Sequence, residues 1–183
     1  MLLAVTMLRS QVLVGATVAL AGRGDAVGDL LARLGARVQR LGELPTDGDR
    51  PGDWSRLHPC QALVFDASEA FGKGGQGGLR ATGEQAWAAV YEVATGSLIA
   101  AEQPGKIVLI GPRPNSGPFA EAARAALENL ARTLATEWAR HRVTVTMIAP
   151  GAGTADAQVA ELVCYLISPG GDYFSGCRFS LEG

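Results

Sequence analysis

Short apolar runs alternate with segments of helical spacing along this sequence, and this alternation constrains the fold more than any other feature. An apolar run of about four to eight residues between turn residues is typical of a strand buried on both faces of a parallel sheet. Six strands are expected, at Thr17–Ala21, Arg37–Leu41, Ala62–Phe65, Lys106–Ile110, Val143–Ile148 and Arg178–Leu181. Crossovers between such strands are right-handed and place helices on both faces, so the pattern predicts an α/β fold with a doubly wound parallel sheet.

The segments between these runs include four with apolar residues at helical spacing. Asp25 is the expected N-cap of the first, and Gly35 ends its pattern. The expected helices cover 26–34, 85–101, 121–140 and 157–167. Residues 42–59 predict an irregular connection with at most one helical turn, and residues 72–83 are so rich in glycine that we expect a mobile loop.

Length and composition limit the kind of protein this is. A chain of 183 residues, 48% of them hydrophobic, is long enough for one buried core, so a single domain over residues 1–183 is expected. A net charge of −2 disfavours binding to nucleic acid or to an anionic membrane. The three cysteines have neither disulfide nor metal-ligand spacing. Arg9, Ser10 and Gln11 interrupt the apolar N-terminus, which predicts no membrane span and a cytoplasmic protein.

Two C-terminal segments resemble the short-chain dehydrogenase/reductase family. AALENLARTLATEWARHRVTVTMIAPG, at 125–151, is similar to that family's fifth helix, sixth strand and Pro-Gly turn, and LVCYLISPGGDYFSGCRFSLEG, at 162–183, to its last helix and strand. VALAGRGDAVGDLLARLGARV and ALVFDAS resemble its first strand with the glycine loop and its fourth strand. The resemblance spans nearly the whole chain except 42–60, and it implies a Rossmann-like sheet.

The catalytic residues of the resembled family are missing. In that family a tyrosine and a lysine four residues later share proton transfer, because the lysine lowers the pKa of the phenol and holds the cofactor ribose. The resemblance places Ala120 at the tyrosine position, Arg124 at the lysine position and Pro112 at the position of the catalytic serine. Nearby Ser116 is expected to be a turn residue. No Tyr-x-x-x-Lys occurs in the chain, so we expect no catalytic residues.

The family's cofactor loop is also altered. Its three glycines let the backbone approach a pyrophosphate at a helix N-terminus. Here Gly22 and Gly28 match the outer two, whereas Ala26 holds the middle place. As an N-cap, Asp25 would occupy the N–H groups that a phosphate needs and would repel its charge. We therefore expect the chain to bind no cofactor itself, with NAD or NADP in a catalytic partner.

The segment that forms a substrate lid in the family is deleted. Only AGTADA, at 152–157, lies between the Pro-Gly turn and the last helix, so no lid could exclude water from a reaction. Loss of these features together predicts a truncated pseudoenzyme. It resembles the flavodoxin-like N-terminal domain of large 3-oxoacyl-carrier-protein reductases and the inactive subunits of heteromeric short-chain dehydrogenases. The resemblance implies a subunit that assembles with a catalytic NAD(P)-dependent dehydrogenase acting on a hydroxyacyl or ketoacyl thioester.

Candidate interface residues lie in two places. The helix at 121–140 has a second face of small or short polar side chains, which would let another helix approach closely, and aromatic residues cluster near the C-terminus. The interface candidates are Ala122, Ala126, Asn129, Thr133, Tyr173, Phe174 and Phe179. A heterodimer, a heterotetramer or a homodimer would satisfy these surfaces.

Two other functions stay open. An oxidoreductase with a non-standard active site would bind NADH or NADPH in solution. A flavodoxin-like module would bind a flavin or another nucleotide, although a serine- and threonine-rich phosphate loop does not follow the first strand.

Overall fold

The structure is a computed structural model that describes residues 8–42, 52–101 and 103–182. In them, six strands form one sheet in the order β2-β1-β3-β4-β5-β6, and each neighbouring pair is parallel. The strands are β1 (Thr17–Ala21), β2 (Arg37–Leu41), β3 (Ala62–Asp66), β4 (Gly105–Ile110), β5 (Val143–Pro150) and β6 (Arg178–Leu181). The doubly wound parallel sheet expected from the sequence is confirmed.

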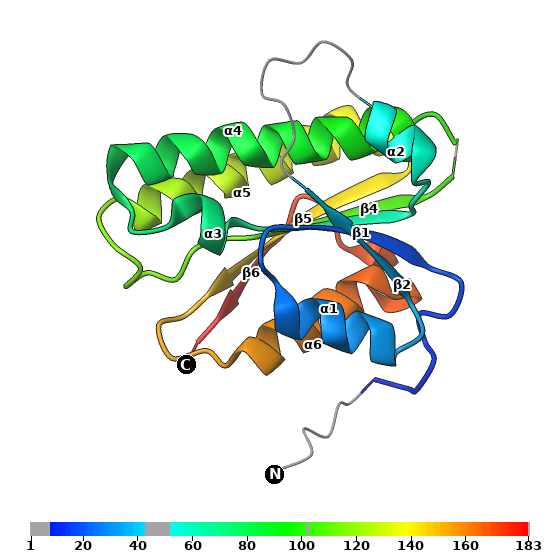
Figure 1. The fold of residues 1–183 in the computed structure, drawn as a ribbon, viewed down its shortest axis with the longest axis horizontal. Helices are drawn as coiled ribbons and strands as arrows, with labels where there is room; N and C mark the ends of the chain where they lie inside the picture. Colours follow the sequence, from blue (N-terminus) through cyan, green and yellow to red (C-terminus); the bar gives the residue numbers. More distant parts are fainter. Residues whose placement is uncertain (1–7, 43–51, 102, 183) are drawn as a thin grey trace.

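Helices cover both faces of this sheet (Figure 1). On one face α1 (Asp25–Arg33) packs against α6 (Asp156–Ile167), and on the other α4 (Gly75–Val93) packs beside α5 (Ala120–Glu137). The short helices α2 (Asp53–Leu57) and α3 (Ala67–Phe71) lie in the layer of α4 and α5. A π-helical turn at Ala94–Leu98 extends α4, and 3-10 turns lie at Ala139–His141 and Pro169–Tyr173. None of the described helices is both long and apolar enough to cross a membrane.

Each central strand supplies side chains to two separate cores, because successive side chains point to opposite faces of a sheet. In β3, Leu63 and Phe65 belong to the core under α4 and α5, whereas Ala62 and Val64 belong to the core against α1 and α6. This is the physical reason for the unbroken apolar runs: both faces of each central strand are buried.

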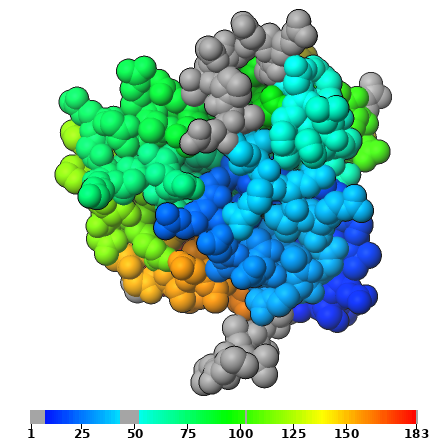
Figure 2. Space-filling model, viewed as in Figure 1, coloured from blue at the N-terminus to red at the C-terminus, as the bar shows by residue number. Residues whose placement is uncertain are grey.

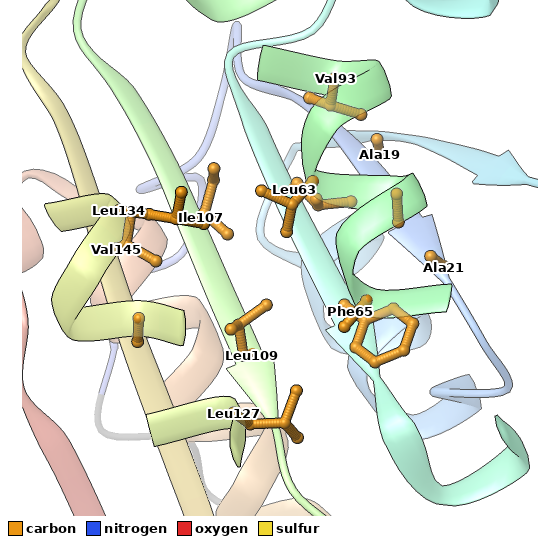
Figure 3. Close-up of a cluster of buried hydrophobic side chains, with 14 of the residues drawn as sticks. Ala19, Ala21, Leu63, Phe65, Val93, Ile107, Leu109, Leu127, Leu134 and Val145 are labelled. Carbon is orange, nitrogen blue, oxygen red and sulfur yellow. The ribbon is translucent and has the colours of Figure 1, made fainter. Parts of the chain in front are cut away.

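Figure 3 shows the core under α4 and α5. Ile107 and Leu109 of β4 lie between Leu63 of β3 and the neighbouring strand β5, and Leu127 of α5 points toward Leu109. These four side chains are at most 1% exposed. Burying one such side chain contributes about 1.5 to 3 kcal/mol, so this layer supplies much of the stabilising free energy.

The prediction of a mobile loop at 72–83 is wrong. The chain instead forms α3 directly after β3, and α4 already begins at Gly75. The glycines permit close packing: a Cβ on Gly78 would lie 2.3 Å from the carbonyl oxygen of Phe71 in α3, whereas one on Gly83 would meet nothing within 4 Å. Close contact between α3 and α4 thus outweighs the low helix propensity of glycine.

Helix α2 is held by a buried carboxylate from α4. Glu92 is 7% exposed, and its Oε1 accepts a hydrogen bond at 2.9 Å from the backbone N–H of Ser55, while its Oε2 accepts one from Gly52. Two N–H groups at the start of α2 are thereby satisfied from a distant element. At most one helical turn was expected in 42–59, and α2 is slightly longer, with five residues. The stretch 43–51 lies outside the described residues.

The edge strand β6 is tied to α5 by Glu128. Arg178 Nη1 donates to Glu128 Oε2 at 2.9 Å, and Arg132 Nη2 lies 2.6 Å from Glu128 Oε1. The hydrogen bond from Arg178, together with the charge of Arg132, holds the pKa of the Glu128 carboxyl below its usual value. The carboxylate form is therefore favoured in the folded state.

A pair of glycine substitutions tests the start of α4. Gly83→Ala should raise the free energy of unfolding by roughly 0.5 to 1 kcal/mol, because alanine favours a helix and its Cβ meets open space. Gly78→Ala should lower it, because its Cβ would collide with the Phe71 carbonyl. Urea denaturation measures both; equal effects of the two substitutions would contradict a helix over 75–83.

The ion pairs of Glu128 predict a pH dependence. A carboxyl with a lowered pKa in the folded state stabilises above its unfolded pKa, near 4.5, and this contribution is lost as the pH falls through the folded value. At pH 7 the wild type should be more stable than Glu128→Gln by about 0.5 to 1 kcal/mol. Denaturation midpoints of both proteins should converge as the pH falls toward about 3. A constant difference across this range would contradict the role of the charge.

Candidate functional site

A pocket of about 230 Å³ opens at the carboxyl ends of the strands. The strand order changes direction between β1 and β3, and doubly wound sheets bind ligands at such a point. Its polar lining comes from the carboxyl ends of four strands and the connections that follow them: Arg23, Asp25, Asp66, Ser68, Arg113 and Asp156. Ser116 also lines it, and its backbone N–H bonds to the Arg113 carbonyl in a turn, as expected. No cluster of three metal-ligating side chains occurs among the residues described here.

The positions that carry chemistry in the resembled family hold packed or occupied groups. Ala120 is 3% exposed and packs with Ala123 against the ring of Phe71 from α3. Pro112 is buried just beyond β4 and uses its carbonyl to accept a hydrogen bond. Neither side chain can donate or accept a proton.

Arg124 ties the ends of two strands together. Its Nη1 donates to the carbonyl of Pro112 at 2.8 Å, after β4, and to that of Pro150 at 2.7 Å, at the end of β5. Its Nε lies 3.2 Å from Oε1 of Glu121, one turn earlier in α5. The residue is only 5% exposed. The position that holds lysine in the resembled family is thus occupied by an arginine that binds the backbone of its own sheet.

Burial lowers the pKa of Arg124 from its usual value, while the carboxylate of Glu121 acts in the opposite direction. A guanidinium still carries its charge at any physiological pH, and it has no acceptor atom. Arg124 therefore cannot serve as a general acid or base. Its chemistry is limited to holding the two carbonyl groups in place.

The loop after β1 depends on glycine at one position. Gly22 has φ 83°, and a Cβ there would lie 2.3 Å from the carbonyl oxygen of Asp66. The expectation that Asp25 caps α1 is wrong: Gly24 is the N-cap, and Asp25 is already the first residue of the helix. The Asp25 carboxylate instead lies 2.9 Å from Nη2 of Arg40, because Arg40 projects from the end of β2 across the loop.

Asp66, the last residue of β3, joins the loop after β1 to the start of α3. Its Oδ2 accepts a hydrogen bond from the backbone N–H of Gly24 at 3.2 Å, and its Oδ1 accepts one from Ser68 at 2.9 Å. The first bond fixes the loop, and the second caps α3. Ala26 and Gly28 follow in the first turns of α1, and Gly28 N–H bonds to the carbonyl of Gly24.

This arrangement does not fit the pyrophosphate of a dinucleotide. The Gly24 N–H already bonds to a carboxylate, and Asp25 and Asp66 both line the pocket with negative charge. That the chain binds no NAD or NADP stays a prediction, and these contacts give its physical basis.

A second arginine bridges the side of the pocket where the family's lid would begin. Arg113 Nη1 donates to the Gly151 carbonyl at 3.0 Å, and its Nη2 lies 2.7 Å from Oδ1 of Asp156. The connection after β4 is therefore joined to the start of α6. The short segment 152–157 leaves room for this direct bridge.

The structure places the candidate interface residues in different environments. Ala122, Ala126, Asn129 and Thr133 all lie on the exposed face of α5. Tyr173 is 91% exposed, whereas Phe174 and Phe179 are partly buried, contact each other edge to face at 5.3 Å and pack against the core next to α6. The last two side chains therefore contribute to the core of this chain.

Sequence reasoning missed an exposed aromatic pair on α4. Trp87 and Tyr91 belong to the apolar pattern of that helix, yet they are 46% and 39% exposed, and their rings stack at 5.4 Å. Val90 and Val93 occupy the buried face instead. Trp87 and Tyr91 are one helical turn apart, so the sequence shows that they share a face of the helix. The apolar pattern alone did not indicate which face is buried. Arg40, Asp66 and Arg113 were missed as well, because their contacts cross between distant segments.

Comparison with solved structures identifies the fold. A citronellol catabolism dehydrogenase, AtuB, of Pseudomonas aeruginosa superposes with a TM-score of 0.73 at 22% identity, over 97% of this chain and 98% of that one. A hydroxysteroid dehydrogenase from Escherichia coli gives 0.71 at 18% identity, over 94% and 98%. A short-chain dehydrogenase/reductase variant from Serratia marcescens gives 0.72 at 22% identity, over 94% and 98%. No family model and no curated protein matches the chain.

The chain therefore has the fold of the short-chain dehydrogenase/reductases, a Rossmann-like α/β fold. Its sheet and helix layers follow those structures. At identities this low the likeness establishes the fold alone.

Substitution of Arg124 tests its structural role. Arg124→Ala should lower the free energy of unfolding by about 3 kcal/mol, because two buried carbonyls lose their donor. Arg124→Lys should lose less, since an ammonium can still reach one carbonyl but lacks the planar guanidinium. Arg80→Ala, at an exposed ion pair of α4, is the control and should change stability far less, because an ion pair open to water contributes little. Similar losses for Arg124→Ala and Arg80→Ala would contradict the assignment.

Proposed function

We propose that this chain is a non-catalytic subunit that assembles with, and stabilises, a catalytic NAD(P)-dependent dehydrogenase of the same fold. The observation that supports it most is that Ala120 and Arg124, at the family's tyrosine and lysine positions, are both engaged in packing or hydrogen bonds within the chain. The first is packed under Phe71, and the second is bonded to the ends of β4 and β5. A carbonyl substrate placed beside them would find no proton donor.

The outer surface of α4 and α5 supports assembly through this layer. Trp87 and Tyr91 expose a stacked aromatic pair on α4, and aromatic residues are enriched in the cores of interfaces. On neighbouring α5, Ala122 and Ala126 are exposed on the same side of the sheet. Large rings beside small side chains allow a partner helix to approach α5 closely while burying the rings of α4.

The substrate class of the partner follows from the sequence resemblance. ALVFDAS and LIGPRP are similar to segments of the flavodoxin-like domain of large 3-oxoacyl-carrier-protein reductases. We therefore propose that the partner reduces or oxidises a hydroxyacyl or ketoacyl thioester, carried by coenzyme A or by acyl-carrier protein. NAD or NADP would be bound by that partner.

Co-expression tests the proposal. The chain should co-purify with the catalytic short-chain dehydrogenase encoded nearest to its own gene, and light scattering should give the mass of a mixed complex. Trp87→Ser combined with Tyr91→Ser should weaken that complex by at least roughly tenfold, because each ring would lose its buried area. Binding is measured by calorimetry with the two purified proteins.

Leu57→Ser is the matched control, since Leu57 is an 80% exposed apolar residue on α2 rather than α4. It should leave the complex unchanged. The proposal fails if the chain remains a monomer beside every such partner, or if the isolated chain turns over an alcohol or a ketone with NADH or NADPH.

A further inference from the structure

We propose that Asp66 and Asp25 act as internal substitutes for a bound diphosphate, so that the chain retains a dinucleotide-type site closed by its own carboxylates. This inference deepens the expectation that the chain binds no cofactor, which forms part of the proposed function.

The frame of such a site is present. Gly22 and Gly24 hold the backbone at positive φ between β1 and α1, as a close approach to phosphate requires. The N-terminus of the nine-residue helix α1 opens on the pocket at the strand switch point, and no side chain caps it. In Figure 2 the blue first part of the chain meets the green of α3 and α4 and the orange of the segment around α6 on this face.

Asp66 binds backbone N–H groups at this loop in the way that a phosphate would. Its two carboxylate oxygens accept backbone N–H groups from Gly24 and Ser68, at 3.2 and 2.9 Å. A phosphate oxygen at a glycine-rich loop accepts N–H groups in the same way. Because Asp66 is part of the chain, it binds without the loss of translational freedom that a free ligand suffers.

Two nearby arginines, Arg40 and Arg113, are also engaged by the protein. Arg40 pairs with Asp25 and donates to the carbonyls of Gly22 and Arg23. Arg113 pairs with Asp156 across the pocket. Each cation that could attract a diphosphate at these two positions is thus neutralised by a carboxylate. A diphosphate would have to displace these pairs and approach Asp66 at close range.

The closing carboxylates can be changed with little damage to the fold. The side chain of Asp25 is 72% exposed, and an ion pair that open to water contributes little to stability. Asparagine at position 66 would still offer an oxygen to the Ser68 N–H, and asparagine is as good an N-cap as aspartate. Each substitution removes one negative charge beside the loop. Asp25→Asn releases the guanidinium of Arg40 from its ion pair, and Asp66→Asn weakens the hold on the Gly24 N–H.

The test measures binding of ADP and of NADH by calorimetry to the isolated full chain. Wild-type protein should bind both at millimolar strength or not at all. Asp25→Asn combined with Asp66→Asn should bind ADP roughly tenfold or more tightly than the wild type, because two like charges no longer face the diphosphate. This gain should shrink as salt rises to roughly 0.3 M.

Asp29→Asn combined with Asp53→Asn changes the net charge equally, away from the loop, and should bind no better than the wild type. The inference is overturned if wild type already binds ADP as tightly as the loop variant, or if the loop and control variants bind alike. Should the double variant not fold, each single substitution should give part of the gain, and no gain in either is a negative result. Nucleotide binding to the isolated chain does not depend on complex formation. A failure of this inference can therefore be distinguished from a failure of the proposed function.

Discussion

Burial of the sheet on both faces is the constraint on which the rest of this structure depends. Parallel strands with apolar residues on both sides are stable only when helices cover each face. Here Ala62 and Val64 face α1 and α6, while Leu63 and Phe65 face α4 and α5. This arrangement brings the carboxyl ends of the strands to one edge, where every connection that could carry chemistry meets.

At that edge, polar side chains serve the architecture of the chain itself. Arg124 joins the ends of β4 and β5, Arg113 joins the connection after β4 to α6, and Asp66 joins the loop after β1 to α3. In each case a charged group that could contact a substrate or cofactor is hydrogen-bonded within the protein. An edge satisfied in this way is consistent with a subunit whose contribution to a larger enzyme is structural.

The strands were predictable because their signal is local and strong. β1, β2 and β6 match the expected ranges, and the others differ by no more than two residues at an end. The helix over 75–83 was not predictable, since glycine disfavours helices and the compensating contact of Gly78 with Phe71 joins two elements. Likewise the exposure of Trp87 could not be inferred, because helical spacing defines a face without saying what covers it.

The amino-acid sequence by itself determined the six strands and their alternation with the long helices, the two-sided burial of the sheet and the absence of a Tyr-x-x-x-Lys pair. Periodicity and residue identity are properties of the chain read locally, so they needed no coordinates. Only the tertiary structure decided that Arg124 binds carbonyls and that Asp25 pairs with Arg40 instead of capping α1. Such choices depend on which donors and acceptors folding brings within about 3 Å of one another, across segments far apart in the sequence.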